Sequence, residues 1–103
     1  MHLQIVTFNL NGISPDEYVE HCDNAAPRFA AMPGLRSKIW IAEPGGQQRG
    51  GVYLWESRRR AEEYEGFAAL RANERFADVA IRDFDVLDGP TSLTRWRDVA
   101  GSA

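Results

Sequence analysis

The fold is decided by two alternating stretches, Pro33-Gly34-Leu35-Arg36-Ser37-Lys38-Ile39-Trp40-Ile41 and Gly50-Gly51-Val52-Tyr53-Leu54-Trp55. Successive side chains of a strand point to opposite faces, so each stretch divides its residues between two surfaces. If the two strands pair as a hairpin, one surface is aliphatic and the other carries a lysine among large aromatic rings. The first surface holds Ile39, Ile41, Val52 and Leu54, and the second holds Lys38, Trp40, Tyr53 and Trp55. An aromatic surface with a few polar groups is typical of a small-molecule pocket.

The rest of the chain predicts two more strands and two helical regions. Alternation predicts a strand over residues 2–10, and Ser14-Pro15-Asp16-Glu17 has the pattern of a helix N-cap with a capping box. We expect strands over 2–10, 35–42, 50–55 and 79–87, and helices from 15 to the Met32-Pro33-Gly34 break, over 57–64 and over 67–76. After Gly89-Pro90 we expect a tail.

The first helix has a buried stripe and one unfavourable residue. Tyr18, Cys22, Ala25 and Phe29 recur at helical spacing and predict the side that faces the core. Pro27 lies inside the same segment. Proline removes a backbone donor, so it should kink or break the helix unless tertiary packing compensates.

The expected order is β-α-β-β-α-β, which predicts an α+β, ferredoxin-like fold with a four-stranded antiparallel sheet. Right-handed crossovers place both helices on one face of the sheet. The simplest cover for the other face is a second copy of the chain, so we expect a homodimer, a dimeric α+β barrel. At 103 residues the chain, 1–103, is expected to be a single domain.

Composition excludes several classes of function. The formal net charge of −3 argues against a nucleic-acid partner, because phosphate binding needs a basic surface. Cys22 is the only cysteine, so no internal disulfide can form and a reducing compartment is expected. The sequence shows no signal peptide and no apolar run of membrane-spanning length, so we expect a cytoplasmic protein without a membrane partner.

A set of short matches resembles one known family in order and at nearly matching spacing. These residues are Phe8, Asn11-Gly12, Pro33-Gly34, Lys38, Trp40, Gly50-Gly51, Tyr53-Leu54, Ala61, Tyr64, Phe84-Asp85-Val86, Pro90 and Leu93. The chain thereby resembles the YdhR-like mono-oxygenase family, small dimeric α+β barrel proteins. The resemblance implies the fold and the dimer, and a mono-oxygenase related to barrels that oxidise polyketide quinols or degrade haem. Ser37 and Trp55 depart from the family pattern, so the shape of the pocket is expected to differ.

Lys38 is the first candidate catalytic residue. A partly desolvated lysine has a lowered pKa and can stabilise or generate a substrate anion. The alternative is that Lys38 reaches the sheet edge while Trp40 packs under the helices. We expect Tyr53 to orient a substrate oxygen, and Trp40, Trp55 and Tyr64 to line the pocket. The alternative for these rings is an ordinary aromatic core.

Two further polar residues are candidates. His21, beside the apolar stripe of the first helix, is a candidate catalytic base because its ordinary pKa suits neutral pH, and otherwise a half-exposed boundary residue. Related barrels place an asparagine near the end of the first strand in the site, so the resemblance makes Asn9 a substrate contact. We expect no metal and no cofactor, because the sequence has no paired ligand spacing and no nucleotide fingerprint.

These observations predict a homodimer that oxidises a small aromatic or polyketide-like molecule, with molecular oxygen as co-substrate and no protein-bound cofactor. Two alternatives stay open. One is a cyclase or isomerase that enolises a similar substrate. The other is a non-catalytic small-ligand-binding dimer, which an exposed Lys38 and a filled space around Trp40 would favour. A shared fold does not decide between them.

Overall fold

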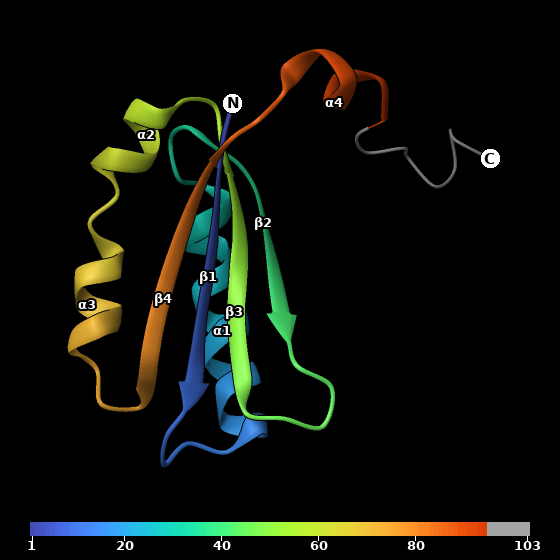
Figure 1. Cartoon of the computed structure of the whole chain (residues 1–103). Coiled ribbons are helices and arrows are strands. Elements are labelled where there is room, and N and C mark those ends of the chain that lie inside the picture. Colours follow the sequence, from blue (N-terminus) through green and yellow to red (C-terminus); the bar gives the residue numbers. More distant parts are fainter. Residues whose placement is uncertain (95–103) are drawn as a thin grey trace.

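The computed structural model describes residues 1–94 of the chain (Figure 1). Its elements are β1 (His2–Leu10), α1 (Pro15–Ala30), β2 (Leu35–Ala42), β3 (Gln48–Trp55), α2 (Arg58–Glu63), α3 (Gly66–Ala72), β4 (Phe76–Asp85) and α4 (Asp88–Thr94). The four strands form one antiparallel sheet in the order β2-β3-β1-β4. The predicted α+β, ferredoxin-like arrangement is confirmed.

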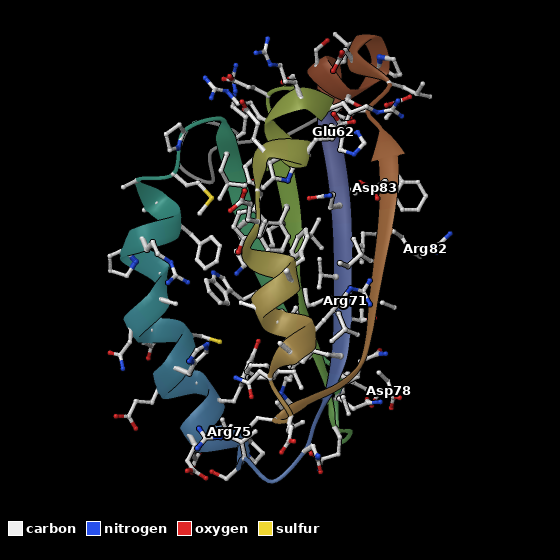
Figure 2. The ribbon with its side chains drawn as sticks, turned by 90° about the vertical axis from the view of Figure 1, so that its left-hand side faces the viewer. Glu62, Arg71, Arg75, Asp78, Arg82 and Asp83 are labelled. Carbon is white, nitrogen blue, oxygen red and sulfur yellow. The ribbon has the colours of Figure 1, made fainter. Side chains whose placement is uncertain are left out.

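Helices α1 and α3 lie on the same face of the sheet, as the edge-on view of Figure 2 shows. In the part of the chain that the structure describes, no helix covers the opposite face. Arg82 of β4 points from the sheet away from the helices and marks this uncovered side (Figure 2). No helix within residues 1–94 is long and apolar enough to cross a membrane.

Helix α1 begins as its sequence predicts and runs through its proline. The Ser14 side chain accepts from the Glu17 backbone N–H, and the Glu17 carboxylate accepts from the Ser14 N–H. The helix continues past Pro27 to Ala30. Pro27 lies in the last turn and removes one helix hydrogen bond, and Phe29 beyond it is buried against the core. Tertiary packing therefore compensates for the proline.

Several boundaries differ from those expected. β3 starts at Gln48 because Gln48 and Arg49 still pair with Asn9 and Phe8 of β1. Helix α3 ends at Ala72 and β4 starts at Phe76, since the buried Phe76 ring belongs to the sheet side of the core. The expected tail contains the short helix α4, with the acidic Asp88 in its first turn, where the helix dipole favours it.

The strands sort their side chains as the alternation predicts. On β1, the side chains of Val6, Phe8 and Leu10 are buried beneath the helices. On the hairpin of β2 and β3, Lys38 pairs with Tyr53 and Ile39 with Val52. The uncovered surface, called here the open sheet face, carries the aliphatic residues Leu3, Ile5, Ile39, Ile41, Val52 and Leu54, of which Ile39 is 46% exposed.

Candidate functional site

A cavity of about 190 Å³ lies between the inner face of the sheet and helices α1 and α3. It exists because β3 carries Gly51 where a larger side chain would fill the space beside Lys38. Eight of its lining residues are Phe, Tyr or Trp, and a few polar groups lie among the rings. It is lined by five of the predicted site residues, which are His21, Lys38, Trp40, Tyr53 and Tyr64.

The amine of Lys38 lies against aromatic ring faces. Its Nζ atom is 3.4 Å from the centre of the Trp40 ring, 3.5 Å from that of Phe29 and 4.7 Å from that of Tyr53. Within residues 1–94, no carboxylate lies within ion-pair distance of this nitrogen. The side chain is therefore held in the cavity wall by rings and not by an acid.

Burial lowers the pKa of Lys38 to about 7, and the nearby Arg28 guanidinium acts in the same direction, while Cys22 opposes them. A lysine with this pKa carries a neutral amine on a large share of molecules at neutral pH. Neutral Lys38 can accept a proton from a bound ligand. The ammonium that results can stabilise the ligand anion.

The tyrosines of the wall keep their protons. Burial raises the pKa of Tyr53 well above its ordinary value, and its contact with the Tyr64 hydroxyl adds to the effect. Burial also raises the pKa of Tyr64. Both hydroxyls thus stay available as hydrogen-bond donors at neutral pH. Burial likewise raises the pKa of Tyr18, and its contact with Cys22 adds to the effect.

His21 reaches the cavity from α1 and is itself exposed. Its ring stacks on Tyr18 with centroids 6.3 Å apart and lies 5.9 Å from that of Phe76. This position at the solvent side gives it a route for proton exchange with water. Arg28 and Asn73 also line the cavity, and sequence reasoning missed both. Arg28 comes one residue before Phe29 of the predicted buried stripe. This position was the only indication in the sequence that Arg28 could line the cavity.

Trp55 does not line this cavity, and its predicted role as a substrate contact stays a prediction. The side chain is buried, and its Nε1 donates to Gln4 Oε1 at 2.8 Å. Gln4 Nε2 donates to Asp83 Oδ1 at 3.0 Å, and His2 Nε2 lies 2.8 Å from the same oxygen. Trp55 still backs the wall, because its ring stacks on Tyr53 with centroids 6.2 Å apart. This network could have been predicted from the polar residues His2 and Gln4, which share the buried face of β1.

Asn9 is not among the residues that line the cavity, and its role as a substrate contact stays a prediction drawn from the family resemblance. Its Nδ2 donates to Asp78 Oδ2 at 3.1 Å on β4. Asp78 has a φ of 55° where the pairing of β1 with β4 shifts register, and it lies at the end of the sheet far from Asp83 (Figure 2). On β1, Asn9 shares the phase of Leu3 and Ile5, which is that of the open sheet face.

Across the described range, 1–94, no three His, Cys, Asp or Glu side chains come together in a way that could hold a metal ion.

Solved structures with the same fold include several oxygenases. The haem-degrading MhuD from Mycobacterium tuberculosis, with two haems in its active site, matches at a TM-score of 0.65 and 18% identity over 84% of this chain and 96% of its own. The cofactor-independent oxygenase SnoaB from Streptomyces nogalater matches at 0.58 and 22% over 82% and 92%. A monooxygenase of Streptomyces coelicolor, from ActVA-Orf6, holding nanaomycin D, matches at 0.63 and 18% over 82% and 86%.

At these identities the structures show the fold alone. None of the curated proteins compared with the chain matches its sequence. A family model does match, over residues 3–97, and its description is "Putative mono-oxygenase ydhR". The matched region includes every predicted site residue. The chain therefore belongs to the ydhR mono-oxygenase family.

Proposed function

We propose that the protein is a mono-oxygenase that binds a small aromatic or polyketide-like substrate in this cavity and oxidises it without a protein-bound cofactor. The observation that carries the proposal is the amine of Lys38, held among ring faces with no carboxylate partner within residues 1–94. Family membership and the fold shared with SnoaB and the nanaomycin D complex support it.

The proposed reaction begins with proton transfer to Lys38. Burial holds the pKa of Lys38 near 7, so its neutral form can take the proton of a phenol or of an acidified CH₂ group. The ammonium then stabilises the substrate anion, and the Tyr53 hydroxyl donates to the substrate oxygen. An electron-rich carbanion reacts with oxygen directly. The atoms and electrons of the reaction balance without a cofactor, because one CH₂ group and one O₂ give one carbonyl group and one water.

The other lining residues have roles in binding and in proton exchange. Trp40 and Tyr64 offer ring faces to a flat substrate, and such pairs prefer stacked or edge-to-face contacts. We assign His21 to proton exchange with solvent, because it lines the cavity and is itself exposed. It is a candidate base for returning Lys38 to its neutral form.

We also propose that the chain, residues 1–103, is a one-domain protomer of a homodimer that pairs through the open sheet face. This face carries a contiguous set of aliphatic side chains, and Ile39 is 46% exposed in the single chain. Exposed apolar patches of this kind mark association surfaces. Two sheets packed face to face would bury them in an interior about 10 Å thick.

Oxygen uptake tests the proposed reaction. The purified protein is given a panel of anthrones and aromatic hydroquinones, with uptake followed by an electrode and label from ¹⁸O₂ sought in the product. We expect uptake with at least one panel member and its loss in Lys38→Met. Turnover that continues without oxygen would instead support the cyclase or isomerase, and binding without turnover would support a non-catalytic ligand-binding dimer.

A further inference from the structure

Lys38 is the only lysine in the chain, among 12 lysines and arginines in total. The other eleven residues of this total are arginines, and most of those that the structure describes are exposed. The single primary amine of a side chain thus lies in the wall of the cavity. Arginine supplies charge as well as lysine does, but it cannot supply a nucleophilic amine at accessible pH.

The surroundings of this amine favour its neutral, nucleophilic form. Nζ contacts the faces of Trp40 and Phe29 and approaches Tyr53, and no carboxylate of residues 1–94 pairs with it. Burial lowers the pKa of Lys38 to about 7, so about half of the molecules carry a free amine at that pH. For an exposed lysine with an ordinary pKa the share is below roughly one in a thousand.

We propose that Lys38 forms an imine with the carbonyl carbon of flat aromatic or conjugated aldehydes and ketones that enter the cavity. The geometry supports this ligand class, because Phe29 lies at 85° to Trp40 and at 72° to Tyr53, so a flat ligand whose carbonyl group lies at the amine would meet both stacked and edge-to-face ring contacts. Lysines in hydrophobic pockets are activated toward carbonyl compounds in this way.

The step balances within the cavity. The Nζ lone pair attacks the carbonyl carbon, and the C=O π electrons move to the oxygen, which receives one amine proton. The second amine proton leaves with that hydroxyl as water, and the C=N bond forms. Tyr53, whose raised pKa keeps its hydroxyl protonated, can relay a proton from nitrogen to oxygen and ends the step unchanged. No oxidant or reductant is consumed.

Reductive trapping tests the proposal. Wild-type protein is incubated with 2-naphthaldehyde and sodium cyanoborohydride at pH 7, and labelled peptides are mapped by mass spectrometry, which separates Lys38 from the amino terminus. An Arg59→Lys variant provides the matched control, since position 59 is exposed on α2 and the new amine shares the molecule with Lys38. We expect Lys38 to be labelled at least tenfold faster than the lysine introduced at position 59.

The pH profile gives a second readout on the same variant. Labelling at Lys38 should level off above about pH 7, while labelling at position 59 should still rise at pH 9. Equal rates at the two positions, or no label on Lys38, would overturn the proposal.

The imine and the proposed oxygenase use the same cavity and the same amine, so trapping and oxygen uptake measured on the same wild-type protein separate them. Oxygen uptake by a wild-type protein that shows no trapping would leave the oxygenase in place and remove the imine. Trapping of Lys38 with no oxygen uptake across the panel would do the reverse.

Discussion

The Nζ atom of Lys38 lies 3.4 Å from the centre of the Trp40 ring, two residues along the same strand. Ile39 between them points to the other face of the sheet, so both side chains face the helices. A cation over an aromatic ring gains about 0.5–2 kcal/mol. Among residues 1–94 no carboxylate pairs with this amine, and the loss of its hydration on burial outweighs the gain from the rings. The pKa of Lys38 is therefore lowered to about 7, and a large share of molecules carries the neutral amine at that pH.

Replacement of Lys38 by methionine should stabilise the protein in a pH-dependent way. The folded pKa of about 7 lies below the unfolded value of about 10.4, so the unfolded chain binds more protons between these two pH values. The stability of wild type therefore rises with pH across this window. The advantage of Lys38→Met should be full below pH 7, on the order of 1–2 kcal/mol after allowance for solvent screening, and should vanish near pH 10.5.

Urea unfolding at pH 6, 8 and 10 measures this difference. Arg36→Met is the matched control, because Arg36 is an exposed cation on the same strand that stays charged throughout. Its effect should not change with pH. A Lys38→Met advantage that is constant from pH 6 to pH 10 would show that the amine is not desolvated in the folded protein.

Two tryptophans that sequence reasoning treated alike should respond differently. Trp55→Phe removes the donor to the buried Gln4 and should cost about 1–3 kcal/mol of unfolding free energy. Trp40→Phe removes part of a half-buried cavity wall, so it should cost less than that and weaken binding of a hydroxyanthraquinone severalfold. Urea unfolding and isothermal titration calorimetry measure the two effects. The opposite pattern would place the ligand at Trp55.

The sequence predicts the two faces of each strand but not what lies across from each residue. Alternation was enough to place Lys38 and Trp40 inside and Ile39 outside. It could not show that Trp55 lies near Gln4, because that depends on the register in which β1 pairs with β3. Asn9 is a different case. Its phase on β1 is that of Leu3 and Ile5, on the open sheet face, so only the family resemblance predicts that it contacts substrate.

Alanine substitutions at two neighbouring glycines of β3 should distinguish an effect on ligand binding from an effect on folding. A Cβ at Gly51 would lie 3.1 Å from Lys38 Cε and 3.2 Å from Tyr53 Cε1, and the lysine chain can move away. Gly51→Ala should thus fold normally and reduce ligand affinity about tenfold by narrowing the cavity. A Cβ at Gly50 would collide with the backbone carbonyl of Val6 on β1, so Gly50→Ala should cost about 3 kcal/mol or more.

Thermal unfolding and calorimetric titration test this pair together. Normal ligand affinity in a folded Gly51→Ala protein would mean that ligands do not reach the space between Lys38 and Tyr53. A Gly50→Ala protein as stable as wild type would contradict the close approach of β3 to β1.

Ile39→Asp should convert the proposed dimer into a folded monomer. Ile39 is 46% exposed on the open sheet face, so a carboxylate there is tolerated in the single chain but unpaired and buried in a sheet-on-sheet interface. Light scattering on a size-exclusion column at about 50 µM measures the mass, and circular dichroism checks the fold. Val19→Asp is the matched control, because Val19 is 55% exposed on α1, away from this face, and its variant should stay dimeric. A monomeric wild type, or dissociation by both substitutions alike, would show that the open sheet face is not where two copies meet.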